Sequence, residues 1–323
     1  MNEIAKIDKS QMIKEVESAS KYLKDALSEN TKRAYKIQWE QFSAWCLVRG
    51  FDALPTTPEI VCIFISWMAD NNKKAATIAR MLSTISKAHG VFDASIVNPV
   101  RTQMVSDEFS GIKRKIGTDQ NRVDPISIKD IKRMADSFEC DVEGIRNKAL
   151  LLLGFFGGFR RSELVAVIRK DVKFSEEGMR VKIAKSKTDQ EGKGFFKSIP
   201  KYTEEKYCAV LALQDWINIA PDSRFLFCHI EGASGPVKEG KKLSDKMVAR
   251  LIQRIAYKLD IKGWFSGHSL RSGFVTAAAK SGKSNRAIMK MTGHKSYAMV
   301  DRYVRLANEF EDNAADGLLV EKK

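Results

Sequence analysis

The segments His268-Ser269-Leu270-Arg271, Thr292-Gly293-His294 and Tyr303 decide what fold and chemistry we expect of this 323-residue chain. Two of its four histidines fall within this stretch. An earlier segment, Gly157-Gly158-Phe159-Arg160-Arg161-Ser162-Glu163-Leu164, places an arginine after a glycine pair. A guanidinium group presents a planar fork that fits two phosphate oxygens. Two arginines on one phosphodiester would stabilise the extra charge of a pentacoordinate transition state. The segments together predict a phosphate-handling site with a tyrosine nucleophile.

Each of these residues also has an ordinary structural explanation when it is taken alone. Arginines form surface ion pairs, histidines fill structural roles, and a tyrosine on an amphipathic helix is usually half-buried. The spacing adds weight, because Arg271 follows His268 by three positions at a helix start and shares its face. His294 is expected at the N-terminus of a short helix, where backbone donors favour an anion. Tyr297 competes with Tyr303 as the nucleophile.

Composition narrows the class of protein and its partner. The length favours two domains, and a hydrophobic content of 44% is enough for sizeable cores. The net charge of +15 indicates a polyanionic partner, with nucleic acid ahead of an anionic membrane surface. The N-terminal 21 residues lack the apolar segment of a signal peptide, and no long apolar run follows. A cytoplasmic protein is therefore expected. The five cysteines contain no zinc-type pair, so no metal site is expected.

Residues 1–116 are expected to form a small all-helical domain. Tyr35, Trp39, Phe42 and Cys46 recur at helical spacing, and residues 28–31 resemble a helix start. Thr57-Pro58 is typical of a capped helix start, so a helix over 59–69 is predicted. Further helices are expected over 12–27, 73–89 and from Asn98 to the basic run at 113–115.

Residues 117–125 are polar and turn-rich and are interpreted as a linker to a second domain, residues 126–323. Helices are predicted there over 127–138, 145–156, 203–219, 244–259, 269–281, 285–291 and 296–306. Short strands are predicted over 172–174, 179–184 and 195–199, the last two flanking a polar hairpin tip. The fold class is therefore mainly α, a helical N-terminal domain followed by an α+β domain with a small antiparallel sheet.

The order and spacing of the segments resemble the tyrosine recombinase (phage integrase) family, in its Cre- or Xer-like two-domain form. The family pattern Gly-x-Arg-x-Ser-Glu-Leu stands at Gly158–Leu164, and His-x-Leu-Arg stands at His268–Arg271. Gly293-His294 precedes Tyr303 at the spacing that the family uses. The helical N-terminal domain is similar to the family's core-binding domain, so the resemblance extends over nearly the whole chain and implies an integrase-like fold.

The resemblance implies a site-specific DNA recombinase that acts through a 3′-phosphotyrosyl intermediate and a Holliday junction, without a cofactor. It assigns Tyr303 as nucleophile and His268 as the base, with Arg160, Arg271 and His294 on the phosphate oxygens. Glu163 would orient Arg160 or His268. A hairpin lysine would protonate the leaving oxygen; Lys187 fits the family context best, and Lys185 and Lys193 remain alternatives.

The resemblance also implies a homotetramer on two DNA sites, with a linker that lets the two domains clamp a duplex. The tail segment Asn308–Val320, which ends in a short apolar tip, is expected to dock on a neighbouring protomer and couple the active sites. Phosphate contacts are expected from basic residues on helices of the first domain: Lys32, Arg33, Lys36, Lys74, Arg80 and Lys87. Type IB topoisomerases and hairpin-telomere resolvases share this chemistry. A non-catalytic DNA-binding regulator or an enzyme acting on RNA would also explain the charge.

Overall fold

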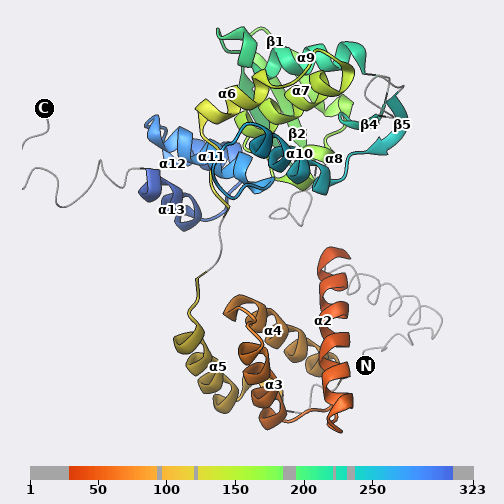
Figure 1. Ribbon diagram of the computed structural model, residues 1–323, viewed down its shortest axis with the longest axis vertical. Helices are drawn as coiled ribbons and strands as arrows, with labels where there is room; N and C mark the ends of the chain where they lie inside the picture. The colour runs from red at the N-terminus through yellow and green to blue at the C-terminus, as the bar shows by residue number, and fades with distance from the viewer. Residues whose placement is uncertain are drawn as a thin grey trace, which may run out of the picture. The chain divides into compact units, whose positions relative to one another are not determined.

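The computed structural model describes residues 29–92, 97–119, 123–184, 194–220, 223–230 and 237–307. The chain divides into two compact units, Met1–Asn121 and Arg122–Lys323 (Figure 1). This division falls inside the segment 117–125 that was interpreted as a linker. The helix predicted over 12–27 lies outside the described residues.

The N-terminal unit is helical throughout its described part. Its elements are α2 (Glu29–Val48), α3 (Pro58–Asp70), α4 (Ala75–Phe92), the 3-10 turn η1 (Pro99–Arg101) and α5 (Gln103–Ile116). The Thr57 hydroxyl caps α3 by accepting a hydrogen bond from the Ile60 amide, and Pro58 takes the first helical position. The core gathers the inward faces of these helices, with Phe42, Trp45, Phe64 and Met68 buried together.

The C-terminal unit contains most of the predicted helices. They are α6 (Ile128–Asp136), α7 (Val142–Phe156), α9 (Ala209–Ile219), α10 (Asp245–Lys258), α11 (His268–Lys280), α12 (Asn285–Thr292) and α13 (Tyr297–Ala307). A short helix, α8 (Arg161–Ala166), was not predicted. Two short 3-10 turns, η2 (Arg169–Asp171) and η3 (Glu205–Tyr207), complete the helical elements. The helix expected over 203–219 is wrong at its start, because Cys208 is extended and separates η3 from α9.

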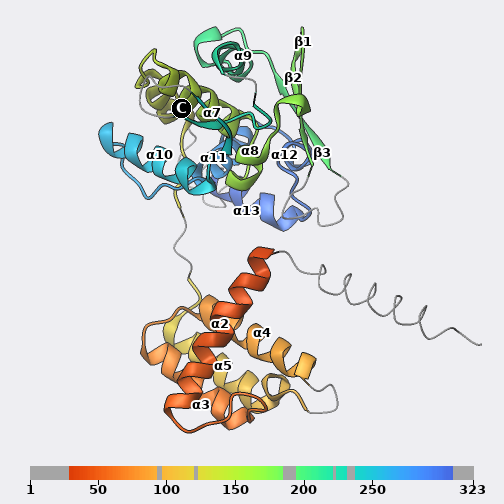
Figure 2. The same ribbon diagram turned by 90° about the vertical axis from the view of Figure 1, so that its right-hand side faces the viewer.

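A small sheet lies at one edge of this unit. Its strands β1 (Val172–Ser175), β2 (Gly178–Ile183) and β3 (Phe195–Pro200) are antiparallel and ordered β1-β2-β3, as Figure 2 shows. The register pairs Val181 with Lys197, and both side chains face the interior. A second, two-stranded sheet of β4 (Cys228–Ile230) and β5 (Val237–Lys242) was not predicted.

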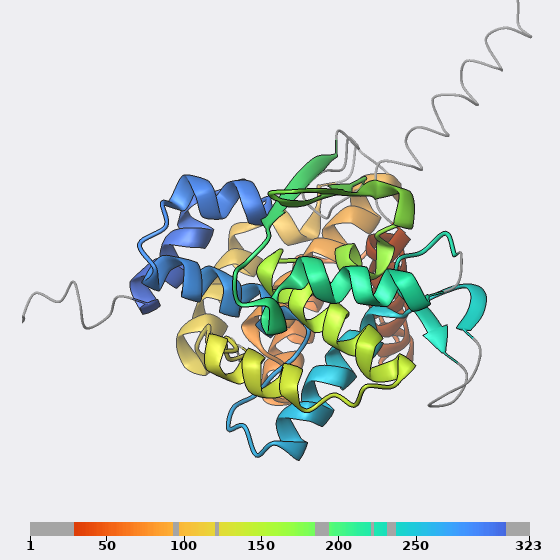
Figure 3. The ribbon, with the colours of Figure 1, turned by 90° about the horizontal axis from the view of Figure 1, so that it is seen from above.

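The main core of the unit surrounds α7, whose leucines are buried on all sides. Helix α9 runs alongside it, as Figure 3 shows from above. A smaller cluster of Val275, Ala279, Ile288 and Val300 holds α11, α12 and α13 together. Among the described residues, no helix is long and apolar enough to cross a membrane.

Candidate active site

Arg160 is held by a short helix that begins directly after it. The Glu163 carboxylate accepts from the Arg160 amide at 3.1 Å and from its Nη1 at 2.5 Å. The amide contact is the glutamate half of a capping box for α8, because the Arg160 side chain has no acceptor for the reciprocal bond, and the Nη1 contact is an ion pair. The Glu163 side chain is only 1% exposed, whereas that of Arg160 is 16% exposed. Glu163 therefore fixes the guanidinium of Arg160 from the buried side.

Tyr303, on α13, lies beside His268 on the neighbouring helix α11. The Tyr303 hydroxyl lies 3.5 Å from Nε2 of His268, which begins α11. Partial desolvation of the imidazole lowers the pKa of His268, and the positive charges of Arg271 and Arg160 lower it further. A histidine of this kind is neutral at pH 7, with a ring nitrogen able to accept the phenolic proton. Tyr297, the competing tyrosine, is 59% exposed at the start of α13.

Arg271 is buried, at 1% exposure, between two turns of the backbone. Its Nη1 donates to the carbonyl oxygens of Gly158 at 2.9 Å and Thr292 at 2.7 Å. Its Nη2 is also buried and has no hydrogen-bond partner among the described residues. Burial lowers the pKa of Arg271 to about 10, assisted by Arg160, so the group stays charged at neutral pH. A buried, charged N–H group without an acceptor is the donor that an anionic ligand would satisfy.

His294 stands in the loop between α12 and α13. The helix expected over 296–306 begins at Tyr297, so His294 precedes it by three residues; Gly293 adopts the left-handed conformation that ends α12. Nδ1 of His294 lies 2.8 Å from the Thr292 hydroxyl, which donates to the Ile288 carbonyl at 2.7 Å. The hydroxyl must then accept from Nδ1–H, which leaves Nε2 as the free nitrogen. Desolvation, with Arg271 and Arg160, lowers the pKa of His294 to about 3.

The three candidate hairpin lysines, Lys185, Lys187 and Lys193, lie outside the described residues. A lysine that sequence reasoning missed, Lys197, is fully buried in β3 next to the site. Its Nζ donates to the carbonyl oxygens of Gly157 at 2.8 Å and Met291 at 2.6 Å. The signal was present in the strand pattern, because alternation places Lys197 on the same inward face as Ile199.

The basic residues expected to contact DNA lie on the surface of the N-terminal unit. Arg33, Lys36, Lys74, Arg80 and Lys87 are exposed, and Lys32 is partly covered. Lys32 forms an ion pair with Glu29 at 2.6 Å, and the Lys87 ammonium lies 5.7 Å from the Tyr35 ring. These positions lie on α2, on α4 and directly before α4.

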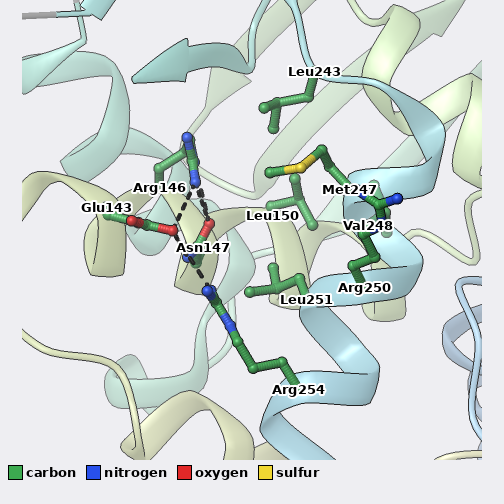
Figure 4. A pocket seen from close by; sticks show the side chains of 10 residues that line it. All are labelled: Glu143, Arg146, Asn147, Leu150, Leu243, Met247, Val248, Arg250, Leu251 and Arg254. Carbon is green, nitrogen blue, oxygen red and sulfur yellow. Dashed lines mark hydrogen bonds and ion pairs between the residues drawn. The ribbon is translucent and has the colours of Figure 1, made fainter. Parts of the chain in front are cut away.

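A separate hollow of the C-terminal unit lies between α7 and α10 and contains no candidate site residue (Figure 4). Glu143 accepts from Arg146 at 3.3 Å and pairs with Arg254 at 3.5 Å. Asn147 accepts from Arg146 at 2.9 Å. Arg146 also donates from Nη1 to the Cys228 carbonyl oxygen of β4 at 3.4 Å, so we interpret the polar groups that line this hollow as a structural ion network.

Comparison with known proteins places both units in one family. The model of the phage integrase family matches residues 122–309, and that of the phage integrase N-terminal SAM-like domain matches residues 20–90. An integrase/recombinase xerD homolog of Selenomonas ruminantium is 37% identical over 300 residues, which cover 92% of this chain and 87% of that protein. Tyrosine recombinase XerC of Vibrio atlanticus is 23% identical over 281 residues, covering 87% and 84% of the two chains.

Solved structures share the fold at low sequence identity. The XerH site-specific recombinase, bound to a palindromic difH substrate after cleavage, superposes with a TM-score of 0.62 at 16% identity, covering 81% of this chain and 72% of that one. A lambda integrase (75–356) dimer bound to a COC′ core site gives 0.60 at 17% identity, covering 95% and 98%. The mainly helical, integrase-like fold expected from the sequence is confirmed.

Proposed function

The chain belongs to the phage integrase family and is a tyrosine recombinase, and from this premise we propose how its own residues cleave and rejoin DNA. Tyr303 attacks the scissile phosphodiester, so that a bond forms between its phenolic oxygen and phosphorus while the bond from phosphorus to the 5′ oxygen breaks. A phenol has a pKa near 10, so a base must assist. His268, 3.5 Å away, takes the proton on Nε2.

The observation that best supports this proposal is that the buried Nη2 of Arg271 has no acceptor among the described residues. A non-bridging phosphate oxygen placed beside it would satisfy that donor and keep the group ionised. Arg160 binds the same phosphate from the α7–α8 turn, with its direction set by Glu163. His294 donates from Nε2 once it takes up a proton. The bound anion favours this protonation because it offsets the positive charges that lower the pKa.

The leaving 5′ oxygen needs a proton of its own. We assign this step to Lys187 of the hairpin between β2 and β3, with Lys185 and Lys193 as the alternatives. The phosphotyrosyl bond conserves the energy of the original phosphodiester, so the 5′ hydroxyl of another strand can attack it in the reverse sense. Two rounds of this exchange on paired sites produce and then resolve a Holliday junction.

DNA binding itself is assigned to basic residues on the surface of the N-terminal unit, all exposed except the partly covered Lys32, which contact phosphates in a salt-dependent manner. These are Lys32, Arg33, Lys36, Lys74, Arg80 and Lys87. We place the reaction in the cytoplasm, on double-stranded DNA that carries a specific recombination site.

Strand exchange requires four protomers on two sites, and we assign the contact between protomers to the C-terminal tail. The tail includes the apolar run Leu318-Leu319-Val320 and four acidic residues before it, Glu309, Glu311, Asp312 and Asp316. An apolar hollow between α7, α11 and α12 offers a matching surface, lined by residues that include Phe155, Phe156, Tyr202, Phe274 and Met291. The one charged residue of its lining is Lys283, which suits an acidic segment.

A suicide DNA substrate, nicked beside the scissile phosphate of the cognate site, tests the reaction. The wild-type protein should form a covalent adduct that survives a denaturing gel, and Tyr303→Phe should abolish it. Tyr297→Phe is the matched control and should leave the adduct intact. An adduct that persists in Tyr303→Phe would move the nucleophile to Tyr297. Specific binding without any adduct would favour a regulator, and relaxation of any supercoiled plasmid would favour a topoisomerase.

A further inference from the structure

Lys197 is the one lysine with a fully buried side chain in the part of the chain that the structure describes. Phe196 and Ser198 beside it on β3 are exposed, whereas Lys197 and Ile199 face inward. Burying an ammonium group is costly unless its protons find acceptors. Here they do: Nζ lies 2.8 Å from the Gly157 carbonyl oxygen, 2.6 Å from that of Met291 and 3.4 Å from that of Gly158.

These acceptors belong to the two backbone segments that carry phosphate-binding residues. Gly157 and Gly158 form the turn that leads into Arg160. Met291 lies in the last turn of α12, three residues before His294. Lys197 therefore ties the strand to both segments, and does so from the side opposite to solvent.

The packing around these contacts leaves little room for adjustment. The Lys197 ammonium lies 4.7 Å from the ring of Phe159 and 5.3 Å from that of Phe195. A Cβ added at Gly293 would stand 2.9 Å from the Phe195 ring, so the loop before His294 lies directly on β3. A Cβ at Gly158 would stand 2.8 Å from the Phe274 ring. The backbone of both segments is thus packed directly against aromatic side chains of β3 and α11.

We infer that Lys197 is a positioning residue for the phosphate-binding site, which fixes the Arg160 turn against the His294 loop. The inference rests on the proposed function. Lys197 does not reach the phosphate in this arrangement, because its three ammonium protons are directed at three carbonyl oxygens. Its contribution to catalysis is the relative placement of groups that do touch the phosphate.

A competing role for Lys197 is that of the general acid. Burial lowers its pKa to about 7, assisted by Arg271 and Arg160, while Glu163 opposes the shift. Such a pKa would suit proton transfer near neutral pH. The two roles differ in what a modified substrate can rescue. A 5′-bridging sulfur leaves as a thiolate, which needs no proton from the enzyme because alkyl thiols have a pKa of about 8.5.

The decisive experiment measures single-turnover adduct formation on oxygen- and sulfur-bridged suicide substrates. Lys197→Met keeps the length of the side chain and removes its donors, and should slow cleavage of both substrates by about 100-fold, the effect of a misplacement of roughly 1 Å. DNA affinity should be unchanged. Lys182→Met, on the exposed face of the neighbouring strand, is the matched control and should cleave at the wild-type rate. Lys197→Arg keeps a cation with several donors and should recover part of the lost rate.

A pH profile separates positioning from plain structural support. A neutral lysine amine has only two N–H donors for the three carbonyl oxygens and turns its lone pair toward one of them. It should therefore position the two segments less well, so wild-type cleavage should decline as Lys197 loses its proton. The charged groups that act on it are Glu163, Arg160 and Arg271, with His294 nearby. Bound phosphate opposes the deprotonation, which places the decline above pH 7. Lys197→Arg stays charged and should lack this decline.

Three outcomes overturn the inference, and a fourth rejects the proposed function on which it rests. Wild-type cleavage by Lys197→Met would show that its donors are dispensable. Rescue of that variant by the sulfur-bridged substrate alone would make Lys197 the general acid. If Lys197→Met does not fold, as judged by thermal unfolding, the comparison of Lys197→Arg with wild type decides, and identical pH profiles reject the inference. Absence of any wild-type adduct would instead reject the proposed function.

Discussion

The hydroxyl of Tyr303 and Nε2 of His268 lie 3.5 Å apart, although 35 positions separate the two residues in the chain. The contact joins α13, the last helix among the described residues of the C-terminal unit, to the N-terminus of α11, three residues before Arg271. It places the proposed nucleophile beside its proposed base and within the electric field of Arg271 and Arg160, which we propose to bind the phosphate. Geometry of this kind requires little rearrangement before proton transfer, because a hydrogen bond forms at about 2.6–3.2 Å.

The pH dependence of cleavage should reflect the state of His268. Its pKa is lowered below the ordinary value of 6.5, so the base stays neutral down to a lower pH than a free histidine would. Single-turnover cleavage should therefore be constant through pH 6.5 and fall only in more acidic solution. His268→Gln should lose about 100-fold or more in rate at neutral pH. An acidic limb centred above pH 6.5 in the wild-type profile would contradict the assignment.

The stability of the C-terminal unit in acid should depend on His294. Its pKa is about 3 in the folded unit and 6.5 as the ordinary value, so the unfolded chain binds a proton first as pH falls. By linkage, stability is fully present above pH 6.5 and is lost progressively between 6.5 and about 3. His294→Gln cannot titrate and should lose less stability over this window. Thermal unfolding across pH checks this, and parallel losses in both proteins would speak against it.

Glu163 should matter for stability as well as for cleavage. Glu163→Ala leaves the Arg160 amide and guanidinium without their partner, and should cost about 3 kcal/mol, as breaking a buried ion pair does. Glu163→Gln keeps one acceptor and most of the packing, so its loss should be smaller. Urea unfolding, followed through amide exchange in α7, gives the comparison. Equal midpoints for wild type and Glu163→Ala would show that the pair contributes nothing.

Salt titrations of DNA binding should distinguish the contribution of Arg33 and Lys36 on α2 from that of Lys32. Arg33 and Lys36 are exposed, and the paired replacement Arg33→Ala with Lys36→Ala should lower the slope of log affinity against log salt by about 2. Lys32→Ala should have a smaller effect, because Glu29 already neutralises Lys32 at 2.6 Å. Fluorescence anisotropy on the cognate site measures both slopes. An unchanged slope in the double variant would place the DNA elsewhere.

Removal of the tail should separate cleavage from synapsis. Deleting the residues after Leu306 should leave adduct formation on a suicide substrate intact, because Tyr303 and its partners remain. Assembly of four protomers on two sites should be lost, as measured by native gel mobility or light scattering. Ala278→Glu puts a charge into the apolar hollow between α7, α11 and α12, and should reproduce the assembly defect. Normal assembly by the truncated protein would exclude the tail as the contact.

Much of this architecture could be predicted because its signals are local. Thr57 before Pro58 and Ser127 before α6 are residues that favour a helix start, because their hydroxyls can accept from a backbone amide of the first turn. Both act as caps in the structure. The strands β1 to β3 follow from short apolar alternation. The second sheet escaped prediction because β5, Val-Lys-Glu-Gly-Lys-Lys over residues 237–242, has no such alternation and gains its order from pairing with β4.

In the candidate site, too, the residues could be named from local sequence motifs, whereas their long-range contacts could not. Arg160, His268, Arg271, His294 and Tyr303 were named from motif spacing, and their roles remain proposals that the geometry supports. Sequence alone left open whether Glu163 serves Arg160 or His268, whereas the structure pairs it with Arg160. The three carbonyl acceptors of Lys197 come from segments about 40 and 94 positions away, so they could not be anticipated from its neighbours in the chain.

The small apolar cluster that attaches α13 to α11 and α12 has a thermodynamic consequence for Tyr303, the proposed nucleophile. Val275, Ala279, Ile288 and Val300 form a core apart from the one around α7, and Tyr303 packs against it. Among the described side chains of α13, Val300 is the one that is fully buried, and a helix attached in this way can detach at a fraction of the global unfolding free energy. The amides of α13 should therefore exchange with solvent well before those of α7. Each protomer would then hold its nucleophile in a local equilibrium between an engaged and a withdrawn state, and a neighbour that contributes only a few kcal/mol could decide which state prevails.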